Sequence, residues 1–241
     1  MTLPHDELVF GYWPARQLRG DIPAAIRHPS EYLGSSVLNI ACTQTELSKS
    51  QQDKLVDEWC HLLPKLPIKT LAFSSKVPQR LFEAACAVPQ LEALSIKWSS
   101  IDSFESISKG TSLKSLFLGS SPKITSLTPI TECVNLEHLF IENIQEPVDL
   151  LFAKKLQRLR EFGLSAARGR KLQVRTLEPL SSLKLLEVLW LVDLQVLEGS
   201  LKPLHSLSSL ASLRTTIKKS SIEFKELCAA VPTLKYFQPV G

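Results

Sequence analysis

Features that would point to a membrane protein, a secreted protein or a disulfide-rich domain are missing from this sequence. No apolar run approaches the roughly 18 residues that a membrane-spanning helix needs. The opening residues, MTLPHDELVF, include an acidic pair and no basic stretch, so they lack the pattern of a secretory signal. We therefore expect a cytoplasmic protein without membrane association.

The cysteines form no metal-binding or disulfide pattern. Their number is odd, and no two of them have the CxxC spacing of zinc sites and redox motifs. The five are Cys42, Cys60, Cys86, Cys133 and Cys228. Scattered cysteines are typical of free thiols buried in a protein from a reducing compartment. We predict no metal site.

Catalytic and nucleotide-binding motifs are absent as well. The sequence contains no GxxxxGK[ST], GxSxG, HExxH or GxGxxG. Cys60 and His61 are adjacent on a predicted helix, where neighbouring side chains point about 100° apart. A nucleophile and its base must face each other, so this pair is no catalytic dyad. We predict that the chain is not an enzyme and uses no cofactor.

The charge is modest. Lys and Arg exceed Asp and Glu by only four, which gives +4 at pH 7. Domains that bind nucleic acid usually have a stronger and more clustered positive charge, so we do not expect nucleic acid as the partner. Hydrophobic residues make up 44% of the 241 residues, which is enough to bury a substantial core.

What the sequence does contain is a repeat. The frame Leu-x-x-Leu-x-Leu, with some substitutions, recurs at intervals of 22 to 27 residues. The copies are IKTLAF (68–73), LEALSI (91–96), LKSLFL (113–118), LEHLFI (136–141), LREFGL (159–164), LEVLWL (186–191), LASLRT (210–215) and LKYF (234–237). The alternation predicts a short strand with two aliphatic side chains on one side. One unit cannot bury these side chains, but stacked units can.

The segments between the frames repeat too. Three of them align without a gap: SLTPITECVNL (126–136), TLEPLSSLKLL (176–186) and SLKPLHSLSSL (200–210). A second type is LFEAACAVPQL (81–91) and FKELCAAVPTL (224–234). Each unit is therefore a strand, a turn and a return segment.

This pattern strongly resembles the leucine-rich repeat family, with short SDS22-like repeats mixed with helical-backed repeats. The resemblance covers roughly residues 35–241. It implies an α/β solenoid, a right-handed horseshoe with a parallel concave β-sheet and a mixed helical and 3₁₀ convex side. We expect residues 1–34 to form an N-terminal capping segment. Residues 35–241 would form about eight to nine units, the last one being the C-terminal cap.

The sequence departs from the family in one respect. Members usually have Asn or Cys three residues after the last leucine of the strand, where the side chain bonds the turn backbone. The corresponding residues here are Lys76, Ser99, Ser121, Ile144, Ala167, Leu194 and Lys218. Only the two serines could partly substitute for the asparagine.

The N-terminal part is less regular. SVLNIACT (36–43) predicts one more strand, and SKSQQDKLVDEWCHLLPKL (48–66) predicts a helix. ELVFGYW (7–13) is expected to form a strand that caps the open sheet edge. The stretch FGYWPARQLRGDIPAAIRH (10–28) also resembles the start of a glutathione transferase, with Tyr12 as the activating tyrosine. No thioredoxin-like βαβ unit follows, so such an enzyme is a remote alternative.

The resemblance implies that outward strand positions present side chains to a partner. Several of these are large aromatics that the core does not require, interleaved with charged residues, which is the composition of an interface. The predicted partner-binding residues are Lys97, Trp98, Phe117, His138, Phe140, Glu142, Asn143, Glu161, Trp190, Asp193, Arg214 and Tyr236. Alternatively, the aromatics cover the sheet by packing on one another across strands.

The longest unit holds a second candidate. Its extra residues fall in SAARGRKLQVR (165–175), which contains Arg168, Arg170 and Lys171. Insertions in repeats map to loops, and loops often carry contacts. The functional interpretation is docking to an acidic protein surface, and the alternative is a solvated basic loop.

We therefore predict a non-enzymatic protein–protein interaction module that is a monomer by itself and binds another protein on its concave face. An immunity protein that neutralises a toxin, a regulatory adaptor subunit and a host-targeted effector all fit this description. No residue of the sequence separates these three roles.

Overall fold

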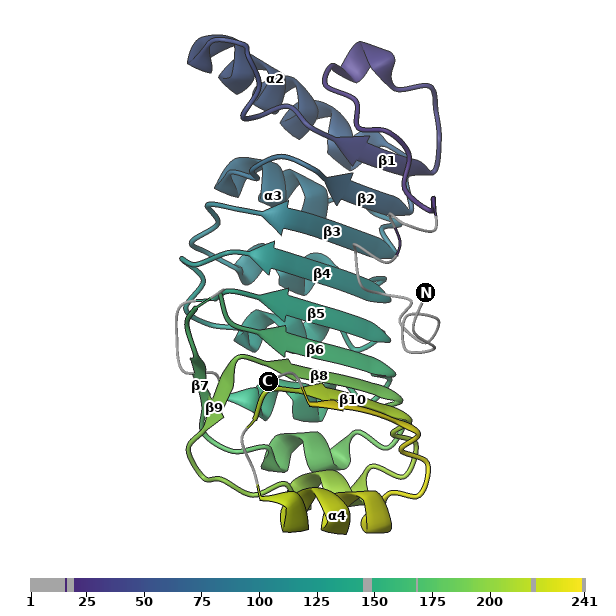
Figure 1. Ribbon diagram of the computed structural model, residues 1–241. Helices are drawn as coiled ribbons and strands as arrows, with labels where there is room; N and C mark the ends of the chain where they lie inside the picture. Colours follow the sequence, from purple (N-terminus) through teal and green to yellow (C-terminus); the bar gives the residue numbers. More distant parts are fainter. Residues whose placement is uncertain (1–15, 17–19, 145–148, 168, 218–219, 240–241) are drawn as a thin grey trace.

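The computed structural model describes residue 16 and residues 20–144, 149–167, 169–217 and 220–239. Nine parallel strands form one sheet in the order β1-β2-β3-β4-β5-β6-β8-β10-β11 (Figure 1). The strands are β1 (Val37–Ile40), β2 (Thr70–Phe73), β3 (Ala93–Trp98), β4 (Ser115–Ser120), β5 (His138–Glu142), β6 (Glu161–Ser165), β8 (Val188–Val192), β10 (Ser212–Thr215) and β11 (Tyr236–Pro239). Eight of these strands lie within or beside the predicted frames, and β1 lies within the strand predicted at 36–43, so the repeat register is confirmed.

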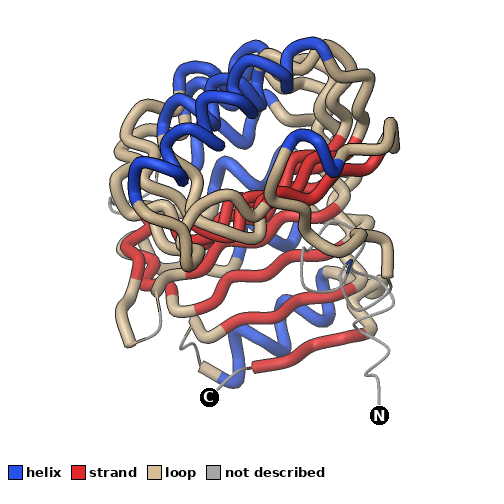
Figure 2. The backbone as a smooth tube through the Cα atoms, turned by 90° about the horizontal axis from the view of Figure 1, so that it is seen from above, coloured by secondary structure: helices blue, strands red, loops and turns tan. Residues whose placement is uncertain are grey.

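The return segments gather on one side of the sheet, as Figure 2 shows. The helices are α2 (Lys49–Leu62), α3 (Gln79–Cys86) and α4 (Ser221–Ala230). The 3₁₀ turns are η2 (Pro29–Glu31), η3 (Leu63–Lys65), η4 (Glu105–Lys109), η5 (Thr128–Glu132), η6 (Leu150–Lys155), η7 (Glu178–Ser182) and η8 (Lys202–Ser206). The expected mixture of helical and 3₁₀ backs is confirmed, which makes the fold an α/β solenoid.

The core consists of aliphatic side chains stacked from strand to strand. In the sheet register Leu71 lies beside Leu94, and the same row continues through Leu116 and Leu139. These side chains are at most 1% exposed. The return segments close the core from the other side, as with Ile107 in η4 and Leu180 in η7. Stacking of units therefore buries what a single unit exposes.

The first helix fixes the N-terminal end of the solenoid. Ser48 caps α2 in a capping box with Gln51, whose backbone N–H donates to the Ser48 hydroxyl. Trp59 is fully buried, and its Nε1 donates to the carbonyl oxygen of Arg27 at 2.8 Å. Ile26 forms a parallel bridge with Ile40 beside β1. The predicted capping strand at 7–13 and Tyr12 lie outside the described residues.

The longest unit contains an element that the sequence did not predict. Residues of its extra stretch form β7 (Leu172–Val174), which pairs in parallel with β9 (Leu194–Val196) of the next unit. The two strands make a separate small sheet at the edge where the main strands end (Figure 1). Leu172 and Leu194 are buried. The insertion is thus partly a strand held by its neighbour.

In the part of the chain that the structure describes, no helix is both long and apolar enough to cross a membrane.

Candidate interaction surface

The outward side chains of the main sheet form two rows, because neighbouring strands are in register. One row contains Ser95, Phe117, Phe140, Gly163, Trp190 and Arg214. The other contains Ser115, His138, Glu161, Val188, Ser212 and Tyr236. The structure therefore brings seven of the predicted partner-binding residues together on the concave face.

The aromatic residues of the first row are buried. Phe117, Phe140 and Trp190 are 4%, 2% and 8% exposed, and they form a second hydrophobic cluster with Ile22. The Phe140 and Trp190 rings meet edge to face, with centroids 5.4 Å apart. The guanidinium carbon of Arg214 lies 5.1 Å from the centre of the Trp190 ring.

Gly163 makes this packing possible. It lies between Phe140 and Trp190 in the sheet register, and a Cβ atom on it would overlap the Phe140 ring. The missing side chain leaves room for the Phe140 ring beside Gly163, where it reaches Trp190. The geometry is the one expected if the aromatics pack on one another across strands.

His138 and Glu161 lie in contact in the second row. The Nδ1 atom of His138 lies 3.1 Å from a carboxylate oxygen of Glu161, whose side chain is only 2% exposed. A carboxylate is costly to bury without a partner, so this contact has a structural role. Arg214 of the first row and Tyr236 of the second row are half-buried, and partner binding by either row remains a prediction.

Trp98 is one of the predicted partner-binding residues. Its large aromatic side chain reaches the surface at the edge where the strands end. It is the last residue of β3 and is half-buried. Its Nε1 donates to Oε1 of Gln44 at 2.5 Å, and the Lys97 ammonium lies 4.5 Å from the centre of its ring. Lys97 itself is exposed. Both contacts hold the indole in one orientation.

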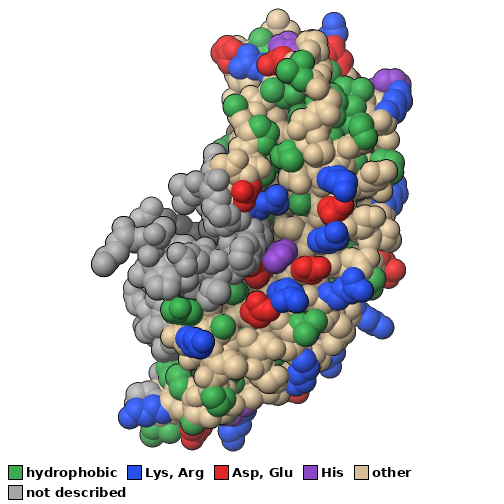
Figure 3. All heavy atoms as spheres, turned by 90° about the vertical axis from the view of Figure 1, so that its right-hand side faces the viewer, with side chains coloured by type: hydrophobic (Ala, Val, Ile, Leu, Met, Phe, Trp, Pro, Cys, Tyr) green, Lys and Arg blue, Asp and Glu red, His purple; other side chains and the backbone are tan. Residues whose placement is uncertain are grey.

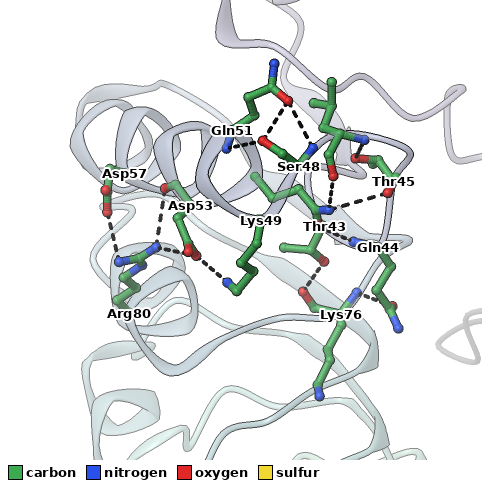
Figure 4. A network of polar contacts seen from close by, with 12 residues as sticks. Thr43, Gln44, Thr45, Ser48, Lys49, Gln51, Asp53, Asp57, Lys76 and Arg80 are labelled. Carbon is green, nitrogen blue, oxygen red and sulfur yellow. Dashed lines mark hydrogen bonds and ion pairs between the residues drawn. The ribbon is translucent and has the colours of Figure 1, made fainter.

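Gln44 can hold Trp98 because a polar network fixes it in turn, as Figure 4 shows. Its backbone has a φ of 55°, and its N–H donates to Oε1 of Gln52. Its side-chain oxygen also accepts from the N–H of Lys76, whose carbonyl accepts from the Thr43 hydroxyl. The turn after β1 is thus bonded to the turn after β2.

Asn143 and Asp193 lie in the turns after β5 and β8. Both have a left-handed backbone, with φ of 50° and 55°, which Asn and Asp adopt more readily than most residues. Asn143 Nδ2 donates to the Ser120 hydroxyl at 2.6 Å, and Asp193 N–H donates to Oγ1 of Thr216. Both residues shape the turns, and Glu142 at the end of β5 is half-buried beside them.

The basic loop of the longest unit also lies at this edge. Arg170 and Lys171 are exposed, whereas Arg168 lies outside the described residues. The loop is held at one end by β8 and at the other by the turn after it, since Ala166 N–H donates to the carbonyl of Val192 and Leu172 N–H to that of Asp193. A pocket of about 300 Å³ lies beside Arg170 and Lys171.

No protein-family model matches the sequence, and neither does any curated protein. Solved structures do match. Internalin C2 from Listeria monocytogenes has a TM-score of 0.59 at 21% identity, over 72% of this chain and 72% of its own. The internalin InlF from the same bacterium has a TM-score of 0.60 at 19% identity. This match covers 83% of this chain but only 51% of InlF, so the chain spans about half the length of that protein. The ectodomain of the Arabidopsis receptor kinase HAESA, solved with an IDA peptide hormone, has a TM-score of 0.53 at 13% identity; the match covers 84% of this chain and 37% of that one.

The chain has the leucine-rich-repeat fold.

Serine replaces the asparagine of this fold at two turns. The hydroxyls of Ser99 and Ser121 lie 2.7 Å apart, and both residues are buried. Ser99 Oγ also accepts the backbone N–H of Ile101. Ser99 thus bonds the turn backbone as expected, whereas the Ser121 hydroxyl bonds Ser99, and Ile144 and Leu194 point into the core instead.

The edge at which the repeat strands begin was missed by the sequence analysis. The second position of successive frames alternates in charge: Lys69, Glu92, Lys114, Glu137, Arg160 and Glu187. Glu92 pairs with Lys69 at 3.2 Å and with Lys114 at 2.8 Å, and Arg160 pairs with Glu187 at 2.6 Å. Figure 3 shows acidic and basic side chains interleaved along this edge. Comparing the second position of every frame would have revealed the alternation.

The chemistry available to the leucine-rich repeats is limited. Burial raises the pKa of Cys42 and Cys133 to about 12, and it raises the pKa of Cys86 and Cys60 as well. A thiol with a raised pKa is a poor nucleophile at neutral pH. All five cysteines are free, and Cys228 is exposed, unlike the buried thiols expected. Among the described residues, no group of three or more His, Cys, Asp or Glu could hold a metal ion.

Proposed function

We propose that this protein is a non-enzymatic protein-binding module. Its partner contacts the edge at which the strands end, together with the adjoining part of the concave face. We call this surface the strand-end edge and define it by Lys76, Lys97, Trp98, Lys123, Arg170 and Lys171.

One observation carries this proposal. Trp98 is a large aromatic side chain that reaches the surface while the Gln44 hydrogen bond holds it in place. Aromatic side chains that are fixed before binding lose little conformational entropy, and Trp is among the residues that contribute most to protein interfaces. The buried aromatic row does not carry the proposal, because its rings are already packed on one another.

The charges of the strand-end edge support the same surface. Its five cations, Lys76, Lys97, Lys123, Arg170 and Lys171, are all exposed. Within the described ranges, none of them has a carboxylate oxygen within 4 Å. Uncompensated charge on one side of a protein raises the rate of association with a partner of opposite charge.

The test has two steps. The protein is used as bait for affinity purification from its native cell, and the affinity of a captured protein is then measured by calorimetry. We expect Trp98→Ala to weaken binding by about tenfold or more, as hot-spot residues do, and Trp98→Phe to lie between.

Leu185→Ala is the matched control, because Leu185 is an apolar side chain, 46% exposed, just before β8 at the opposite edge. A captured protein that binds both alanine variants as tightly as the wild type would contradict the proposal. The nature of the partner then decides between the three expected roles. A toxin would identify an immunity protein, an enzyme or signalling protein an adaptor, and a host protein an effector.

A further inference from the structure

The outer edge of β7 has unused backbone hydrogen-bonding groups. Leu172 N–H donates to the Asp193 carbonyl, and the Val174 carbonyl accepts from Leu197 N–H, so both residues face β9. Backbone groups along a parallel strand alternate between its two sides. The N–H and C=O of Gln173 therefore point outward, where nothing in the described part of the chain bonds them.

The side chains of this strand alternate as well. Leu172 and Val174 are buried, whereas Lys171, Gln173 and Arg175 are exposed. Two cations thus flank the open backbone groups of Gln173 on the solvent side. Neither Lys171 nor Arg175 forms an ion pair with a described residue.

Space for a ligand adjoins this edge. The pocket of about 300 Å³ is lined by Leu172, Arg170 and Lys171 on one side and by the turn residues Pro122 and Asn143 on the other. Its volume is at the lower end of the range for ligand pockets. The pocket therefore lies between β7 and the turns of the preceding units.

We propose that the outer edge of β7 and this pocket bind an extended acidic segment of the partner protein. The backbone of the segment pairs with Gln173, and its carboxylates contact Arg170, Lys171 and Arg175. Strand addition of this kind supplies main-chain hydrogen bonds, and opposite charges on neighbouring strands stabilise the pairing. This inference rests on the proposed function, since it specifies the chemistry of the partner.

The backbone groups favour a peptide over a nucleic acid. Gln173 offers one donor and one acceptor, and a peptide backbone offers both in return. A phosphate backbone supplies acceptors only, so it would leave the Gln173 carbonyl without a donor. The strand edge therefore matches an extended protein segment.

The test uses a fluorescein-labelled peptide of alternating glutamate and threonine, with anisotropy measured at low and at high salt. We expect salt-sensitive binding that the double variant K171E/R175E weakens by about tenfold.

The matched control is K154E/K155E, which makes the same charge change on two exposed lysines of η6 on the convex side. We expect this control to bind within about twofold of the wild type, because its charges lie far from β7. The same peptide with alternate amides N-methylated keeps its charge but cannot pair through its backbone. We expect the wild-type protein to bind this peptide as weakly as K171E/R175E binds the unmodified peptide.

Several outcomes would overturn the inference. Equal losses in the two double variants would show that overall charge attracts the peptide. Full binding of the N-methylated peptide would rule out backbone pairing. Tighter binding of an oligonucleotide of equal charge would assign the edge to nucleic acid. No peptide binding, together with self-association of K171E/R175E in light scattering, would show that the cations only protect an exposed strand edge. A partner whose binding needs Trp98 but tolerates K171E/R175E would refute this inference and leave the proposed function intact.

Discussion

The two edges of the sheet use charge in opposite ways. Where the strands begin, Glu92 bridges Lys69 and Lys114, and Arg160 pairs with Glu187. At the strand-end edge, Arg170 and Lys171 are exposed, and neither forms an ion pair with a described residue. One edge pairs several of its charges within the sheet, and the other is the surface that we propose for a partner.

The difference follows from register. A residue one position before each strand is placed beside its counterpart in the next unit, because the stacked leucines fix that position. Charges there meet at a constant spacing, and alternation makes them attract. The turns after the strands differ in length, so residues such as Lys123 and Arg170 have no such counterpart. Regular positions therefore pair with one another along the solenoid, and the irregular ones include the residues that we propose for binding.

The largest effect is expected from a glycine at the strand-end edge. A Cβ atom on Gly119 would overlap the backbone carbonyl of Lys97, which no side-chain movement can relieve. We expect Gly119→Ala to lower the free energy of unfolding by about 2–4 kcal/mol, measured by urea denaturation.

Gly163→Ala is the control for this variant, because its clash is with the Phe140 side chain. We expect Gly163→Ala to lower the free energy of unfolding too. Adding Phe140→Leu to this variant should restore part of the lost stability, since the smaller side chain frees the space over β6. A Gly119→Ala protein as stable as the wild type would show that β3 and β4 do not approach so closely at this edge.

A smaller effect is expected from the buried serine pair. Ser121→Ala leaves Ser99 Oγ without the hydroxyl that lies 2.7 Å away. A lost buried hydrogen bond costs about 1–2 kcal/mol, so each single alanine variant should be destabilised by that amount. In the double variant neither hydroxyl remains, and we expect a loss smaller than the sum of the two. Strictly additive losses in chemical denaturation would show that the two serines do not interact.

The sequence predicted the features that stacking enforces. The Leu116 and Leu118 alternation and its spacing from unit to unit determine the strands, because no other arrangement buries these side chains. The difference between helical and 3₁₀ backs was also visible, as in the contrast between residues 81–91 and 126–136. Solenoid stacking is therefore a local property of the chain.

What the sequence did not predict depends on contacts between particular units. Gln44 and Trp98 are 54 residues apart, and their hydrogen bond needs a left-handed turn after β1. The pairing of β7 with β9 joins two turns that look like loops when each is considered alone. The burial of Trp190 depends on the absence of a side chain at Gly163, one strand away. Such contacts have no periodic signal.

The smallest effect is expected at the edge where the strands begin. Hydrogen bonds from Lys114 and Lys69 lower the pKa of Glu92 below its ordinary value of 4.5. Its contribution to stability is therefore present above that ordinary value and is lost as the pH falls through the lowered, folded-state pKa. Glu92→Lys removes both ion pairs and places three like charges in a row, so we expect a small drop in Tm at neutral pH.

High salt should abolish most of that drop, because exposed ion pairs are weak and readily screened. Glu132→Lys makes the same charge change at an exposed acid that forms no ion pair with a described residue, and it should leave Tm nearly unchanged. Equal drops in the two variants would mean that overall charge and not pairing is responsible. Glu92→Lys should also leave the affinity for the captured partner intact, because Glu92 lies at the opposite edge from Trp98. A loss of affinity as large as that of Trp98→Ala would place the partner on both edges and remove the distinction between them.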